Sequence, residues 1–138
     1  MITKNFILMC EQAEEIQKTS NQIVDGDYYY WSVDKKIHLS FTENFMHEHG
    51  YVVHHPEQWD YLNERKCIWL PTQEQLQKMM TEQGYFRFTL IELFYHFASD
   101  VFKSNSSQKF SMNELWLAFV MQEKYNKAWT GDKWVKAE

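Results

Sequence analysis

The chain has 138 residues, of which 44% are hydrophobic, 24% charged and 17% aromatic, and its formal net charge is −5. This composition excludes wholesale disorder and predicts one globular domain over residues 1–138. The acidic balance argues against duplex nucleic acid as a partner. A duplex-binding surface needs clustered Lys and Arg, and the chain's arginines are Arg65 and Arg87 alone. No apolar run approaches the length of a membrane span, so we expect no membrane partner.

The N-terminal residues 3–19 carry apolar side chains at three- and four-residue steps, which predicts an amphipathic helix with Thr3 as its N-cap. Acidic residues follow the first apolar stretch directly, from Glu11 onward, so the segment does not have the pattern of a secretion signal. Cys10 and Cys67 stand in no metal or redox spacing. Together these features predict a cytoplasmic protein with buried thiols.

Three segments of the first half favour strands. Residues 28–33 are aromatic and β-rich, and residues 36–41 alternate apolar with polar side chains, so we expect the two to form a hairpin. Residues 51–53 are a third and shorter candidate. No clear periodicity marks the rest of residues 42–66.

The pattern sharpens from Cys67 onward. Residues 67–70 are a short apolar run that predicts a buried strand. A helix is expected over residues 72–82, because Thr72 and Gln75 have the spacing of a capping box and Gly84 suits the end of a helix.

Residues 85–102 combine two periodicities. Alternation over residues 85–89 indicates a strand or an extended entry, and the three- and four-residue steps over residues 90–102 predict a helix. The apolar face expected for this helix consists of Leu90, Leu93, Phe94 and Phe97.

The last helix, predicted over residues 112–126, has the clearest signals. Ser111 and Glu114 have the spacing of a second capping box. The middle of the segment, around Trp116, is apolar almost all round, so we expect this helix to be central and buried.

These elements predict an α+β fold in a single domain. A small, mostly antiparallel sheet would be built from residues 28–33, 36–41, 51–53 and 67–70. About four helices would cover it, over residues 3–19, 72–82, 90–102 and 112–126.

Four histidines form the one cluster that suggests a metal. His47, His49, His54 and His55 lie within nine positions, and imidazole nitrogens are ligands that zinc prefers. The spacing matches no established zinc motif, and a solvated loop explains the same residues. A metal-binding protein or a metal-dependent enzyme that uses this loop is therefore the alternative hypothesis.

The aromatic residues allow three interpretations. Tyr28 to Trp31 could stack against bases of single-stranded nucleic acid, although only Lys35 and Lys36 lie close by in sequence. Aromatic side chains on a hairpin and in the tail are also typical of protein interfaces, and the candidates there are Tyr28, Tyr30, Trp129 and Trp134. The third interpretation is that these rings fill the core.

Several stretches resemble a group of small uncharacterised proteins encoded by phages and prophages of Gram-positive bacteria. The matching pieces are residues 26–29, 68–77, 114–121 and 124–127 and Trp129. The resemblance implies a phage origin, a place in the cytoplasm of the bacterial host, and a relation to the small α/β sandwich proteins of phages. It implies no catalytic residue.

The sequence shows no P-loop and no nucleophile elbow, and its paired carboxylates lie in an apparent turn and on an exposed helix face. We therefore expect a non-enzymatic phage or prophage accessory protein without a cofactor. It would act by binding an unidentified protein partner or by forming a homo-oligomer.

Overall fold

The computed structural model describes residues 2–19, 26–32, 34–40, 52–54, 67–104 and 109–137. Within these residues the fold is α+β, as predicted, with five helices and six strands. Contacts divide the chain into two compact units. One comprises Ala13–Pro71, and the other comprises Met1–Gln12 together with Thr72–Glu138. The prediction of a single domain stays a prediction.

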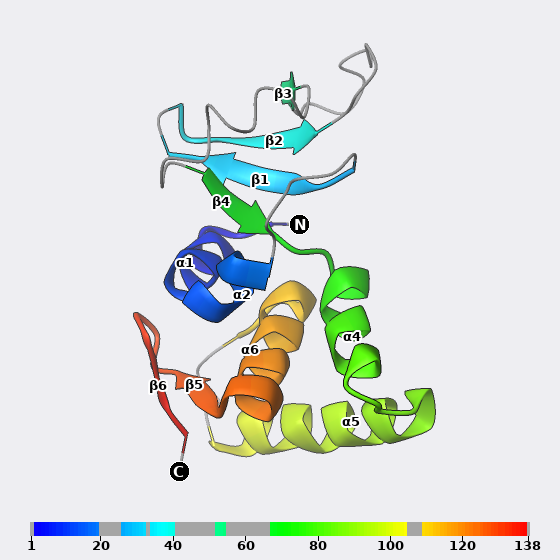
Figure 1. Ribbon diagram of the computed structural model, residues 1–138. Coiled ribbons are helices and arrows are strands. Elements are labelled where there is room, and N and C mark those ends of the chain that lie inside the picture. Colours follow the sequence, from blue (N-terminus) through cyan, green and yellow to red (C-terminus); the bar gives the residue numbers. More distant parts are fainter. Residues whose placement is uncertain are drawn as a thin grey trace. The chain divides into compact units, whose positions relative to one another are not determined.

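The unit Ala13–Pro71 contains a four-stranded sheet in the order β3-β2-β1-β4 (Figure 1). The strands are β1 (Tyr28–Trp31), β2 (Lys36–Ser40), β3 (Val52–His54) and β4 (Cys67–Leu70). β1 pairs antiparallel with both β2 and β4, whereas β3 runs parallel to β2. The sheet is thus mostly antiparallel, and each predicted strand forms within two residues of its expected ends.

The aromatic strand β1 lies inside the sheet and has a partner on each side. Tyr29 is opposite His38 of β2 and Trp69 of β4, and its side chain is 1% exposed. Leu39, Ile68 and Leu70 are also buried. Because successive side chains point to opposite faces of a strand, both faces of this small sheet contribute buried residues.

The predicted continuous helix 3–19 is two helices, α1 (Lys4–Gln12) and α2 (Glu14–Thr19), separated at Ala13. Thr3 is the N-cap that the sequence predicts, since its Oγ1 accepts from the Phe6 N–H at 2.9 Å. The break coincides with the boundary between the two compact units. α1 buries its apolar side chains in one unit, and α2 buries Ile16 in the other.

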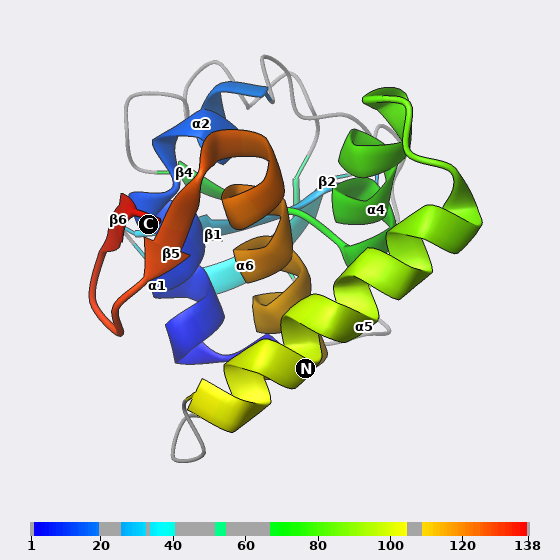
Figure 2. The same ribbon diagram turned by 90° about the horizontal axis from the view of Figure 1, so that it is seen from below.

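The second unit is built around α6 (Met112–Tyr125), which packs against α1, α4 (Gln73–Glu82) and α5 (Arg87–Ser104). Figure 2 shows α5 lying across α6 at an angle. Trp116 and the five residues that follow it are all buried, which confirms that this helix is central. The unit is completed by a two-stranded ribbon, β5 (Lys127–Trp129) and β6 (Trp134–Lys136), which the sequence did not predict.

The helix ends largely follow the predicted signals. Thr72 and Gln75 form the complete capping box at the start of α4, and Gly84 follows the end of that helix at φ 95°, a conformation that favours glycine. The strand or extended entry expected over residues 85–89 is wrong from Arg87 onward, because α5 already begins there. The alternation of Phe86, Phe88 and Leu90 was misleading, since the two phenylalanines are exposed and only Leu90 is buried.

The capping box expected at the start of α6 forms only in part. Ser111 Oγ accepts from the Glu114 N–H at 3.2 Å, as predicted. The Glu114 carboxylate, however, accepts hydrogen bonds from Thr3 Oγ1 and, at 2.9 Å, from Asn5 Nδ2. A buried carboxylate needs such donors, and the start of α1 supplies them.

Candidate functional site

The predicted histidine site falls mainly on residues that the structure does not describe. His47, His49 and His55 lie outside the described ranges, and His54 is placed only as backbone in β3, opposite Ser40. Within the described ranges no three His, Cys, Asp or Glu side chains come together as metal ligands. Zinc binding by this loop stays a prediction.

The predicted interface residues of the hairpin lie in the sheet. Tyr28 and Tyr30 are half-buried, and each is opposite apolar residues of β2 and β4. A stacking platform for bases needs ring faces open to solvent. Tyr28 and Tyr30 offer only part of their surface.

The predicted interface residues of the tail pair with each other. Trp129 and Trp134 are opposite across the β5–β6 ribbon, with ring centroids 5.0 Å apart, and both are half-buried. Trp134 Nε1 also donates to the Met9 carbonyl oxygen of α1 at 3.0 Å. These contacts give the two indoles a structural role, because they fasten the ribbon to α1.

A buried polar cluster that the sequence did not indicate lies on the sheet. His38 is 0% exposed; its Nε2 is 2.7 Å from Asp34 Oδ2, and its ring stacks on Tyr29. The alternation of apolar and polar residues over β2 indicated that His38 faces solvent. Only Asp34, the acidic residue four positions earlier, pointed to a partner for its ring. The contacts of His38 hold the β1–β2 turn in place.

The thiol near this cluster is unsuited to nucleophilic chemistry. Burial, with a smaller contribution from Asp34, raises the pKa of Cys67 to about 12. Burial also raises the pKa of Cys10 well above its ordinary value. Because the thiolate is the reactive form, both cysteines are expected to be inert near neutral pH.

The most unusual surface is an exposed apolar face of α5. Four large side chains on this helix, Phe88, Ile91, Tyr95 and Phe102, are 89%, 64%, 68% and 80% exposed. We call these four residues the α5 face. Steps of three, four and seven residues place them on one side of the helix.

The opposite side of α5 carries the residues that bind it to its own unit. Leu90 and Phe97 are buried, and Phe94 stacks on Trp116 of α6 with ring centroids 3.9 Å apart and an interplanar angle of 3°. Phe97 also contacts Phe119, with ring centroids 5.5 Å apart. α5 therefore presents two apolar sides, one packed and one open.

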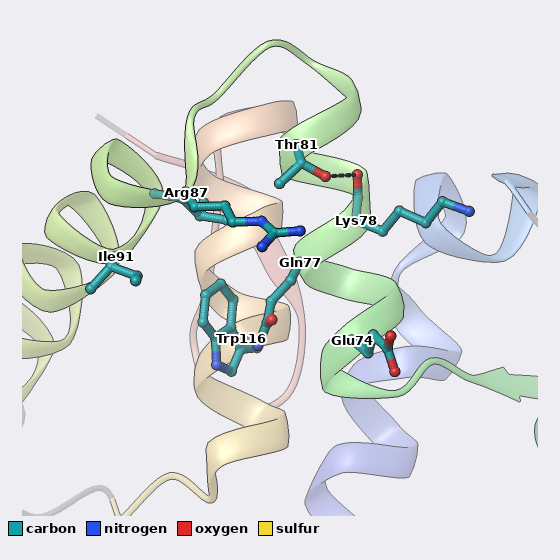
Figure 3. Close-up of a pocket in the computed structure, with 8 residues that line it drawn as sticks. Glu74, Gln77, Lys78, Thr81, Arg87, Ile91 and Trp116 are labelled. Carbon is teal, nitrogen blue, oxygen red and sulfur yellow. Dashed lines mark hydrogen bonds between the residues drawn. The ribbon is translucent and has the colours of Figure 1, made fainter.

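A cleft of about 610 Å³ adjoins the α5 face where α4, α5 and α6 meet. Figure 3 shows Arg87 extending from α5 towards α4, with the Trp116 ring beside Gln77. The lining also includes Ile91 of the α5 face. The remaining lining residues are Glu74, Lys78, Thr81 and Leu90.

The lining of the cleft carries few charged groups. Its charged groups are one carboxylate, Glu74, and two cations, Lys78 and Arg87. The Thr81 hydroxyl donates to the Lys78 carbonyl oxygen at 3.0 Å, so it is held by its own helix. No pair of acid and base converges on a nucleophile among these lining residues.

The sequence could have revealed the α5 face. Phe88, Ile91, Tyr95 and Phe102 recur at helical steps as clearly as the face predicted from Leu90, Leu93, Phe94 and Phe97. Periodicity alone does not say which of two apolar sides is buried.

Comparison with known proteins does not supply a family. No protein-family model matches the chain, and neither a curated protein nor a solved structure matches it. Among the described residues no helix is both long enough and apolar enough to cross a membrane.

Proposed function

We propose that this chain is a non-enzymatic protein that acts by binding another protein chain, and that the α5 face is its binding surface. The single observation that carries the proposal is the exposure of Phe88, Ile91, Tyr95 and Phe102, between 64% and 89%, along one side of one helix. Scattered apolar residues are normal on a protein surface. A continuous stripe of this kind is typical of an interaction site.

The composition of the α5 face supports this proposal. Protein interfaces are enriched in aromatic side chains at their centre, and three of the four residues are Phe or Tyr. A large aromatic ring buries about 150–250 Å² when it is fully covered. An amphipathic helix with anchors at these steps is also a recurring way in which proteins recognise each other.

The α5 helix itself is held rigidly enough to present such a surface. The rings of Phe94, Trp116 and Phe119 all contact one another, and this cluster fixes the inner side of the helix. A rigid helix loses little conformational entropy on binding. The open side is therefore ready for a partner without rearrangement.

The biological setting is part of the same proposal. The resemblance to phage and prophage proteins of Gram-positive bacteria supports an accessory role in the cytoplasm of an infected or lysogenic cell. A small protein that redirects a partner by binding needs a surface and no catalytic group. The α5 face provides such a surface.

Capture from cell extract tests the proposal. The tagged wild-type chain would be compared with a variant in which Phe88, Ile91, Tyr95 and Phe102 are all Gln, a residue that favours helices. A matched control would carry Gln at Thr89, His96 and Lys103, which are exposed on the polar side of α5. Circular dichroism would verify that all three chains are folded.

The proposal expects at least one protein, either a foreign chain or the untagged chain itself, to be retained by the wild type and by the control. The same protein would be lost with the face variant. Identical capture by all three chains would contradict the proposal.

A further inference from the structure

We propose that the occupant of the α5 face is the α5 face of a second copy of this chain, with the two helices side by side and parallel. This inference rests on the proposed function and makes it specific. It is carried by the spacing of the apolar residues, by the charges beside them and by the area available.

The spacing of the α5 face is that of a two-helix seam. If Phe88 is assigned to the first position of a heptad, Tyr95 and Phe102 occupy the same position in the next two heptads. Ile91 and Ala98 then occupy the fourth position. Every first and fourth position from 88 to 102 is thus apolar, which is the pattern that packs one helix along another.

The charges beside the seam select the orientation of the second helix. In the same heptad assignment, Arg87 occupies the seventh position of one repeat. Glu92 occupies the fifth position of the repeat that follows. In a parallel pair these two positions lie across the seam from each other, so Arg87 of each copy would meet Glu92 of the other. In an antiparallel pair the fifth positions of the two helices face each other instead, so Arg87 and Glu92 do not meet.

Both charged residues are available for such a contact. Arg87 and Glu92 are exposed, and neither forms an ion pair within the part of the chain that the structure describes. A two-fold axis along the seam makes the contact twice, once on each side. The surface is therefore complementary to itself in charge.

The area is sufficient for a specific dimer. Three rings that are each at least two-thirds exposed, together with Ile91, would bury roughly 400–600 Å² on each copy. The total of about 1,000 Å² reaches the lower limit for a specific protein interface. We therefore expect a weak and reversible dimer.

Charge reversal tests the inference with two variants. Arg87→Glu alone places Glu opposite Glu92 on both sides of its own dimer, and Glu92→Arg alone places Arg opposite Arg87. A mixed dimer of the two variants has attractive pairs on both sides. The two variants differ in mass, so native mass spectrometry of the mixed full-length chains counts each kind of dimer.

The inference predicts that the wild-type chain is dimeric and that each variant alone dimerises more weakly. In an equimolar mixture random pairing gives as many mixed dimers as homodimers, whereas we expect mixed dimers to outnumber homodimers by about tenfold, because two attractive surface pairs replace two repulsive ones. This excess would shrink as salt is added.

Three results would overturn the inference. A wild-type chain that stays monomeric at all concentrations would exclude the second copy as the occupant, while capture of a foreign protein through the α5 face would still support the proposed function. A dimer that pairs randomly in the mixture would exclude the parallel alignment. A monomer that instead floats with vesicles of neutral and anionic lipid would assign the α5 face to a membrane surface.

Discussion

The side-chain amide of Gln17 forms two hydrogen bonds with the backbone of Trp69. Its Nε2 donates to the Trp69 carbonyl oxygen at 2.9 Å, and its Oε1 accepts from the Trp69 N–H at 2.8 Å. Trp69 lies in β4, an end strand of the described four-stranded sheet. One residue of α2 thus does for Trp69 what a neighbouring strand would do, and it occupies backbone groups that an exposed edge leaves open.

Loss of this amide should destabilise the unit Ala13–Pro71. Gln17→Ala leaves two backbone groups of Trp69 without these partners, and we expect the free energy of unfolding to fall by about 1–3 kcal/mol. Urea denaturation followed by fluorescence measures the change. Lys18→Ala, at an exposed position of the same helix, is the control. Equal midpoints for the two variants would show that the Gln17–Trp69 pair contributes nothing.

The buried carboxylate of Glu114 should couple energetically to Asn5. Glu114 is 3% exposed, and Asn5 Nδ2 donates to its Oε2 at 2.9 Å. A double-mutant cycle with Asn5→Ala and Glu114→Ala is expected to give a coupling free energy of about 1–3 kcal/mol, as for hydrogen bonds to charged groups. If the loss of stability in the double variant equals the sum of the two single losses, the hydrogen bond between Asn5 and Glu114 contributes no coupling between α1 and α6.

Truncation should have very different effects at Trp116 and at Phe88. Trp116 is 7% exposed and stacks on Phe94, so Trp116→Ala should lower the free energy of unfolding by about 3–5 kcal/mol. Phe88 is 89% exposed, so Phe88→Ala should change the stability of the monomer by less than about 0.5 kcal/mol. The comparison belongs at a protein concentration low enough to avoid association. A similar loss for both variants would refute the exposed position of Phe88.

Stability should decline as the pH is raised between about 9 and about 12. Burial raises the pKa of Cys67 from an ordinary value of 9.0 to about 12, so in this window the folded chain keeps a thiol proton that the unfolded chain has lost. The unfolded state then binds fewer protons, and the free energy of unfolding falls with rising pH. Below about pH 9 the contribution of the protonated Cys67 thiol to the free energy of unfolding is fully present.

Cys67→Ala provides the control for that prediction. Without the thiol, the decline measured by urea denaturation at a series of pH values should be shallower than in the wild type. It should not vanish, because burial raises the pKa of Tyr29 in the same direction. An unchanged slope would show that Cys67 titrates alike in both states.

The sequence predicts most of the elements because local signals and burial agree there. The capping residues Thr72 and Ser111 mark the starts of α4 and α6, and the apolar circumference of α6 indicates a central helix. The strands β1, β2 and β4 follow from aromatic, β-branched and alternating residues. Each of these elements can therefore be predicted from the residues of its own short segment.

The features that matter for the site depend on contacts between distant segments. The Glu114 carboxylate binds Asn5, 109 positions away. No local pattern predicts this contact in place of the capping box at the start of α6. His38 is buried because a turn and two aromatic rings surround it. α5 is apolar on two sides, and only the packing of Phe94 against Trp116 reveals which side stays open.

Sedimentation equilibrium of the purified chain over a range of concentrations tests the central claim most directly. The wild type should change reversibly from monomer to dimer as its concentration rises, and so should the control with Gln at Thr89, His96 and Lys103. The folded variant with Gln at Phe88, Ile91, Tyr95 and Phe102 should remain a monomer throughout. If the variant and the wild type share one association curve, the α5 face does not bind a second copy.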